Sequence, residues 1–320
     1  MKPTLHLFSL ASIFFTLQVP ALKIATSLQW IEHTPQPYAI KNFYKGSDTA
    51  SLMSGGVANI VTDKTIDLAA NAETQGLKQY SSHRNLRLIY VIVEVGYRIV
   101  ANKASGINKL ADLKGKKVGT MPGTSAAYFV NKLLGSAGLA PADYSVVSGS
   151  VCMKTPCGSG TLPQMLTGKQ VDAFGIWEPA VELGAKALGS NAVIFQNASI
   201  YREVYSLYST EEKLKDATTR KNIVAFVKAL DQTLDVFTKN PSTVYATVAS
   251  AVGMDEAVVE AVWPDHKWSG DLPADLLDFL VEEDQYLAKQ DGRAVVSRAE
   301  LANFIDPSIL DEVKKSSTVR

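Results

Sequence analysis

Short apolar runs of strand length alternate with segments of helical spacing over the first two thirds of the chain. The runs are rich in β-branched and aromatic residues and are LKIATSLQW (22–30), TIDLAAN (65–71), LRLIYVIV (86–93), YRIVAN (97–102) and VDAF (171–174). Strands that alternate with helices predict an α/β fold with a largely parallel sheet covered on both faces. Ligands of such sheets gather beyond the carboxyl ends of the strands.

The C-terminal third has a helical pattern. Residues 219–237 place Ile223, Phe226, Val227, Leu230 and Leu234 on one face. Further predicted helices follow in NPSTVYATVASAVG, DEAVVEAVW and PADLLDFLVEEDQYLAKQ, separated by Asn-Pro, Gly and Pro. We expect these helices to form a layer that closes over the sheet.

The first residues resemble a secretory signal. An apolar run from Leu5 to Leu17 follows Lys2, and small residues surround Ala21. The run is short for a membrane span, which favours a signal peptide over 1–21, cleaved near Ala21, and a secreted location, extracellular or periplasmic. The alternatives are a membrane anchor or a misassigned start. A strand pattern that begins at Leu22 leaves almost no leader and counts against the signal.

Composition narrows the function. The 320 residues carry 32 basic and 32 acidic side chains without a basic patch, so nucleic acid is not an expected partner. Cys152 and Cys157 are predicted to form a disulfide, with two free thiols or a metal or redox pair as alternatives. The four histidines are scattered, so no metal site is predicted. Asn197 begins a sequon for N-glycosylation, relevant only in a eukaryotic secretory route.

A Pro-Gly turn precedes one predicted helix start. Gly123, Thr124 and Ser125 lead from a short strand into AAYFV. A helix N-terminus offers free backbone N–H groups and partial positive charge, so it can hold an acidic group without Arg or Lys. The alternative is that Thr124 or Ser125 only caps its own helix. The Gly-Lys-Ser/Thr of a phosphate-binding loop is absent.

Two stretches together resemble a known family. GINKLADLKGKKVGTMPGTSAAYFVNKLLGSAGLAPADYSVV (106–147) and LPQMLTGKQVDAFGIWEPAVELG (162–184) are similar to the signature regions of substrate-binding proteins of nitrate, sulfonate and taurine importers. That superfamily also holds binding proteins for thiamine pyrimidine precursors and the eukaryotic enzyme that makes the pyrimidine. The resemblance runs from about Leu22 to Ala249.

The resemblance implies a type 2 periplasmic binding protein fold, in which two α/β lobes joined by a hinge enclose a ligand cleft. Lobe 1 would comprise 22–99 and 203–320, and lobe 2 would comprise 100–202. The crossings would fall near 97–100 and 200–202.

Carried onto this sequence, three further segments would face the cleft beside Gly123, Thr124 and Ser125. They contribute Gln29, Trp30, Glu32, His33, Asn71, Glu73, Thr74, Trp177 and Glu178. Each has a structural alternative: the tryptophans as core residues, Glu73 as a helix cap, His33 as a structural or solvated side chain. Two indoles with nearby carboxylates suit a cationic or amino-heterocyclic group, and the helix start suits an acidic one, so we expect a zwitterion or aminopyrimidine-like ligand rather than nitrate.

The expected function is binding and hinge closure around a small molecule, with no cofactor, as a monomer that docks on a membrane importer if the source is bacterial. An enzyme related to the pyrimidine synthase is the alternative, but its cysteine-rich iron-binding segment is absent, as are a Ser-His-Asp spacing and a cofactor fingerprint. A third alternative is an extracellular protein without a transport role.

Overall fold

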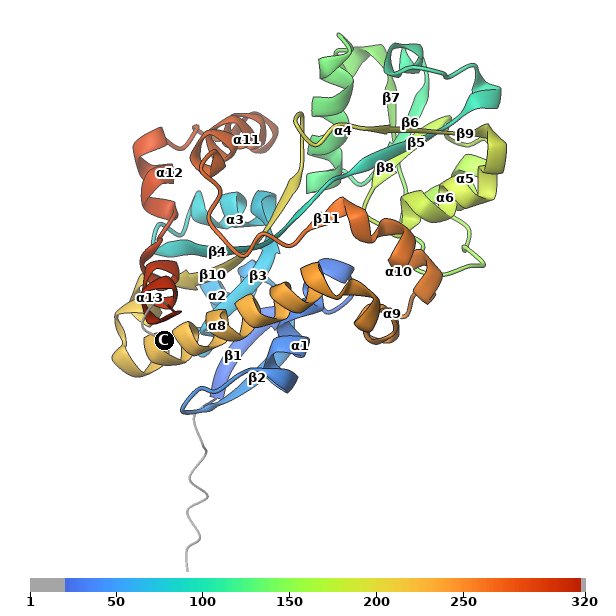
Figure 1. Cartoon of the computed structure of the whole chain (residues 1–320). Helices are drawn as coiled ribbons and strands as arrows, with labels where there is room; N and C mark the ends of the chain where they lie inside the picture. The colour runs from blue at the N-terminus through green and yellow to red at the C-terminus, as the bar shows by residue number, and fades with distance from the viewer. Residues whose placement is uncertain (1–20, 318–320) are drawn as a thin grey trace, which may run out of the picture.

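The computed structural model describes residues 21–317 and has two lobes, each built around its own β-sheet (Figure 1). The predicted signal peptide therefore lies outside the described residues, except for Ala21, where the first strand begins. The two lobes, with a cleft between them, confirm the α/β type 2 periplasmic binding protein architecture.

The larger lobe contains a six-stranded sheet. In spatial order its strands are β11 (His266–Lys267), β4 (Leu86–Val95), β10 (Glu203–Thr210), β3 (Leu68–Ala72), β1 (Ala21–Thr26) and β2 (Thr49–Ser54). Strand β1 pairs in parallel with β2 and β3, whereas β10 runs antiparallel to both β3 and β4. Strands β1 to β4 therefore share one direction, as expected for a largely parallel sheet, and β10 and β11 run opposite to them. The sheet is mixed because β10 arrives from the other lobe and inserts between β3 and β4.

Helices cover both faces of this sheet. They are α1 (Pro35–Asn42), α2 (Val57–Thr62), α3 (Glu73–Tyr80), α7 (Glu211–Lys215), α8 (Ala217–Lys239), α11 (Leu276–Asp291), α12 (Arg298–Phe304) and α13 (Ser308–Ser317). The connections through α1 and α2 run in opposite directions along the sheet, and right-handed crossovers then place these helices on opposite faces. Helix α8 packs on α1, and α3 packs on α2 and α11.

The predicted apolar face of α8 is confirmed. Ile223, Phe226, Val227, Leu230 and Leu234 are all buried. Within residues 21–317, no helix combines the length and apolarity that a bilayer crossing requires.

The smaller lobe contains a five-stranded sheet and three α-helices. Its strands, in spatial order, are β7 (Ser145–Ser148), β6 (Lys117–Thr120), β8 (Ala173–Ile176), β5 (Arg98–Asn102) and β9 (Ala192–Gln196), and its helices are α4 (Ser125–Ser136), α5 (Leu162–Thr167) and α6 (Ala180–Leu188). A disulfide joins Cys152 and Cys157, whose Cα atoms are 5.5 Å apart. It closes a short loop between β7 and α5.

The chain crosses between the lobes twice. It leaves the six-stranded sheet after Val95 and enters the other sheet at Arg98, and it returns between Gln196 and Glu203. Helix α10 (Glu256–Val262) packs on α6 of the smaller lobe, and α9 (Tyr245–Val252) packs on α10 (Figure 1). The lobe boundaries by residue number therefore stay a proposal.

Asn197 is exposed in the second crossing, and its glycosylation stays a prediction.

Candidate functional site

A cleft of about 420 Å³ lies between the lobes, where β1, β2, β3, β6 and β8 end. Most of its lining follows the ends of these strands, as expected for ligand sites of α/β sheets. The lining comprises Ser27, Trp30, Glu32, His33, Gly55, Gly56, Val57, Ala58, Asn71, Ala72, Thr74, Gln75, Gly123, Thr124, Ser125, Trp177 and Glu203.

Two tryptophans, one from each lobe, pack on each other at the cleft. Trp30 belongs to the larger lobe and Trp177 to the smaller one, and their ring centroids are 5.3 Å apart with planes tilted by 49°. The Trp177 Nε1–H donates to Ser125 Oγ at 3.1 Å, and Ser125 Oγ lies 3.1 Å from the Tyr97 hydroxyl. The hydrogen bond to Ser125 fixes the orientation of the Trp177 ring. Because Trp30 and Trp177 both line the cleft, each lobe offers an aromatic surface to a flat or cationic group.

Two buried carboxyl groups line the larger-lobe wall. Glu32 is 7% exposed and Glu203 is 3% exposed. Burial raises the pKa of Glu32 to about 7, and burial together with Glu32 and Glu73 raises the pKa of Glu203 well above its usual range. Glu203 Oε2 is buried without a hydrogen-bond partner. Because an unsatisfied buried acceptor is costly, this oxygen suits a ligand that donates a hydrogen bond or carries positive charge.

His33 is a neutral acceptor in the same wall. Its Nδ1 accepts the Ser27 backbone N–H at 3.2 Å and lies 2.9 Å from Thr26 Oγ1. A backbone N–H can only donate, so the ring proton is on Nε2. Burial lowers the pKa of His33 to about 3. The ring also packs on Tyr205, with centroids 4.5 Å apart, so His33 is both a structural residue and part of the lining.

The start of α4 forms part of the smaller-lobe wall. Thr124 precedes the helix, but its Oγ1 donates to the Met121 carbonyl at 2.7 Å and makes no capping bond. The first N–H groups of α4 therefore have no side-chain cap, which argues against Thr124 as a simple N-cap. Gly123 has φ of +78°, a conformation that favours glycine. Its carbonyl accepts from Lys78 Nζ at 2.7 Å, a contact between the lobes.

A second helix start, that of α3, enters the cleft from the larger lobe. Thr74 is fully buried in its first turn, and Thr74 Oγ1 has no hydrogen-bond partner. Asn71, just before this helix, also lines the cleft, but its Oδ1 accepts the Val57 N–H at 2.6 Å and so holds the start of α2. The hydroxyl of Thr74 is therefore the polar group at this start that a ligand could satisfy.

The structure brings together nine of the twelve residues named for the site. Trp30, Glu32, His33, Asn71, Thr74, Gly123, Thr124, Ser125 and Trp177 line the cleft. The other three lie outside the lining. Gln29 is exposed. Glu73 is buried beneath it, where it accepts the Tyr201 hydroxyl and the Val204 N–H, each at 2.7 Å. Glu178 turns away to Arg98, 2.7 Å from its Nη2.

Sequence reasoning did not identify Ser27, Ala72, Gln75, Glu203 or the segment Gly55–Ala58 as lining. Glu203 had a usable signal, because an acid that opens a long apolar strand directly after the second crossing must lie close to the hinge and the cleft. Gly55–Ala58 offered none, because a short Gly-Gly turn after an exposed edge strand resembles an ordinary loop.

Among residues 21–317, no three His, Cys, Asp or Glu side chains are placed to share a metal ion.

The chain is similar to proteins that are named as binding proteins. A Brucella abortus (strain 2308) protein, named provisionally as a binding protein, is 26% identical over 180 residues, which are 54% of this chain and 52% of that protein. The chain thus spans about half the length of the curated relatives it matches. The alkanesulfonate-binding protein SsuA from Xanthomonas axonopodis pv. citri, solved with bound MOPS, has a TM-score of 0.65 at 16% identity, over 90% of this chain and 98% of that chain.

An enzyme also has this fold. DSZB, a desulfurization enzyme solved in complex with biphenyl-2-sulfinic acid, has a TM-score of 0.64 at 15% identity, over 92% of this chain and 99% of that chain. At these identities both solved structures support the fold alone. The family model described as "NMT1/THI5 like" matches residues 52–244, more than half of the chain. The chain therefore belongs to the NMT1/THI5-like family.

Proposed function

We propose that the protein is a solute-binding protein that holds a small zwitterion, or an amino-heterocycle with an acidic group, in the cleft between its lobes. One observation carries this proposal: the larger lobe presents buried Glu32 and Glu203, and the smaller lobe presents the uncapped start of α4. Acceptors and a positive helix end thus face the same space from opposite lobes. A ligand that bears both charges satisfies both walls only when the lobes are closed.

The amino end of the ligand belongs at Glu203. Its free Oε2 would accept from an amine or a ring N–H, and Trp30 and Trp177 would contact the attached aliphatic or aromatic part. A nearby cation would favour the ionised carboxylate, so binding lowers the carboxyl pKa and releases a proton. A bare inorganic anion gains nothing from this wall.

The acidic end belongs at the helix starts. The first N–H groups of α4 and the hydroxyls of Thr74 and Ser125 supply donors without a full positive charge. SsuA is named for alkanesulfonates and was solved with MOPS, a molecule with a tertiary amine and a sulfonate. That likeness supports a sulfonate or comparable oxyanion as one end of the ligand of this chain.

Secretion and delivery to a membrane importer are part of the same proposal. The apolar segment over 1–21 and the fold of SsuA support them, since SsuA from Escherichia coli is described as periplasmic. If the source is a eukaryote, scavenging or sensing takes the place of import.

A thermal-shift screen confirmed by native mass spectrometry tests the proposal. The probes are taurine, MOPS, an aminopyrimidine with and without a phosphate ester, sodium sulfate and sodium nitrate. We expect stabilisation by a probe with both an amine and an acidic group, and a 1:1 complex. Stabilisation by sulfate or nitrate alone would contradict the proposal.

A hydrolase is the second candidate, because Ser27 Oγ lies 3.0 Å from His33 Nδ1 in the cleft. The same Nδ1 already accepts the Ser27 N–H, and burial lowers the His33 pKa to about 3, so the ring is a weak base for Ser27. We expect no burst with p-nitrophenyl acetate above that of Ser27→Ala. A Ser27-dependent burst would favour the enzyme over the binding protein.

A further inference from the structure

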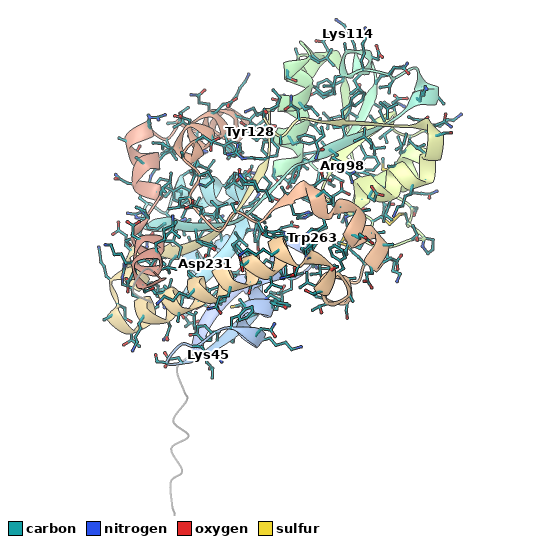
Figure 2. All side chains as sticks on the ribbon, in the orientation of Figure 1. Lys45, Arg98, Lys114, Tyr128, Asp231 and Trp263 are labelled. Carbon is teal, nitrogen blue, oxygen red and sulfur yellow. A yellow bond between two sulfur atoms is a disulfide. The ribbon has the colours of Figure 1, made fainter. Side chains whose placement is uncertain are left out.

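Arg98 lies at the first crossing between the lobes (Figure 2). It is paired with carboxyl groups of both lobes. Its Nε donates to Glu178 Oε1 at 2.8 Å, and its Nη2 lies 3.2 Å from Glu182 Oε2, both in the smaller lobe. The same Nε lies 3.2 Å from Asp265 Oδ2, which belongs to the larger lobe. The four side chains are between 7% and 15% exposed, so solvent screens these pairs less than surface pairs.

Asp265 is fixed to the larger lobe. It ends the short 3-10 turn η7 (Trp263–Asp265), and its carbonyl accepts the Gly96 N–H at 2.8 Å. Trp263 anchors this turn by packing on Phe237 of α8, with ring centroids 5.4 Å apart. A carboxylate with so little freedom can define where Arg98 lies.

Gln196, where the second crossing begins, also contacts this cluster of Arg98, Glu178, Glu182 and Asp265. Its Nε2 donates to Asp265 Oδ1 at 2.8 Å and to the Gly96 carbonyl at 3.0 Å. A Cβ on residue 96 would approach this Nε2 to 2.9 Å, so Gly96 leaves the space that the amide uses. Asp265 therefore contacts both connections between the lobes.

The turn at residues 177–179, before α6, connects this cluster to the cleft. Glu178 Oε2 accepts the Glu182 N–H at 3.0 Å, which ties the turn before α6 to the helix. Trp177, the residue before Glu178, lines the cleft and donates to Ser125. Lys186 Nζ lies 3.6 Å from Glu182 Oε1. The carboxyl groups of Glu178, Glu182 and Asp265 therefore share two cations, Arg98 and Lys186. Burial, opposed by Arg98, raises the pKa of Glu178 to about 7.

We propose that Asp265 is a positioning residue that, through Arg98 and Glu178, fixes both the angle between the lobes and the place of Trp177 in the cleft. The inference rests on the proposed function only where Trp177 is taken as a wall for the ligand. Asp265 itself does not line the cleft.

The test compares Asp265→Ala with a matched control. Asp67→Asn removes an ion pair of similar burial inside the larger lobe, where Asp67 Oδ1 lies 2.7 Å from Lys213 Nζ and the aspartate is 11% exposed against 15% for Asp265. Two measurements need no ligand: the indole ¹⁵N–¹H resonance of Trp177, assigned with Trp177→Phe, and the radius of gyration from small-angle X-ray scattering. We expect Asp265→Ala to shift the resonance and increase the radius, Asp265→Glu to restore both, and Asp67→Asn to change neither.

An unchanged resonance and radius in Asp265→Ala, or equal changes in Asp67→Asn, would overturn the proposal. If Asp265→Ala does not fold, Gln196→Ala is judged by the same two measurements. With MOPS as the probe, we expect the Kd to rise roughly fivefold through faster dissociation. If the wild-type protein binds neither MOPS nor any other probe, the proposed function fails, and the ligand-free measurements still decide the role of Asp265.

Discussion

Glu203 and Glu32 give the cleft its chemical character at the scale of single residues. Neither carboxyl group is paired with a Lys or Arg of the described residues, and burial raises the pKa of both. Carboxyl groups are rarely buried without a basic partner, and a ligand that donates to the unpartnered Glu203 Oε2 would offset part of the cost of burying it. Glu178, in contrast, is already paired with Arg98 and is therefore not available to a ligand.

Glu203→Gln tests this assignment. Loss of a charged hydrogen bond to an amine costs about 1.5–3 kcal/mol, so we expect the affinity for an amine-bearing probe to fall tenfold or more by calorimetry. Glu283→Gln is the control, because Glu283 is equally buried with both carboxyl oxygens unpartnered but does not line the cleft. Equal losses in both variants would mean that Glu203 acts through stability alone.

The buried carboxyls also predict how stability depends on pH. The pKa values of Glu32 and Glu73 rise from 4.5 to about 7, with burial as the largest cause. A carboxyl with a raised pKa in the folded state contributes stability that is full below 4.5 and is lost as the pH rises through 7. We therefore expect a lower Tm at pH 8 than at pH 5, and a smaller difference in Glu32→Gln. A difference as large in the variant as in the wild type would contradict this origin.

Gly123 shows how one residue shapes an element, the start of α4. Its φ is +78°, and a Cβ added to it would have only Lys78 Nζ within 4 Å, so an added methyl group meets backbone strain rather than a clash. We expect Gly123→Ala to lower the free energy of unfolding by about 1 kcal/mol in urea denaturation. Gly135→Ala, inside the same helix in open space, should raise it by up to about 1 kcal/mol. The opposite order would show that the turn does not need a left-handed residue.

The disulfide loop is an element that contacts both lobes. Cys152 and Cys157 form a small apolar cluster with Leu183 of α6 and Val258 of α10, and Lys154 Nζ lies 2.8 Å from Asp255 Oδ1. Replacing both cysteines by serine should lower the free energy of unfolding by roughly 2 kcal/mol, the loop-closure value for so short a loop. Thermal unfolding with and without reductant checks this. A wild-type Tm that does not change on reduction would contradict it.

Elements were predictable from the sequence where their determinants are local. The face of α8 and the start of α3 at Glu73 follow from spacing within a few residues, and the structure confirms both. The first strand was predicted through Trp30 but ends at Thr26, because Leu28 has a positive φ of 61° and turns the chain toward the cleft. The antiparallel insertion of β10 depends on pairing with strands more than 100 residues earlier, which no local pattern encodes.

The candidate site shows the same limit. Trp30 and Trp177 were expected at the cleft because ligands of α/β sheets lie beyond the carboxyl ends of strands, and each of these residues follows such an end in its own lobe. Side-chain direction was not predictable: Glu73 and Glu178 lie one residue from lining positions and are instead held by Tyr201 and Arg98. Their partners come from the crossings, whose geometry appears only when the whole chain is folded.

At the scale of the whole molecule, contacts on both flanks of the cleft hold the lobes together. Besides Lys154 and Asp255, Lys132 Nζ of α4 lies 2.8 Å from Glu282 Oε2 of α11, and Lys78 reaches the Gly123 carbonyl. These contacts form only when the lobes are close. Each involves an exposed side chain, so each contributes little to closure on its own.

Charge reversal at the flank tests whether closure sets the lifetime of the complex. Lys154→Glu places two negative charges together at the α10 flank, so we expect MOPS, or whichever probe the screen identifies, to dissociate up to about fivefold faster with little change in association rate. The double variant Lys154→Glu with Asp255→Lys should restore the wild-type rate. Lys215→Glu, which breaks the pair with Glu211 inside the larger lobe, is the control and should leave the dissociation rate unchanged. Because the reversed pair lies outside the cleft lining, a faster rate that the double variant restores would arise from lobe closure and not from contact with the ligand. Equal dissociation from all four proteins would show that the lobes do not need this flank to retain a ligand.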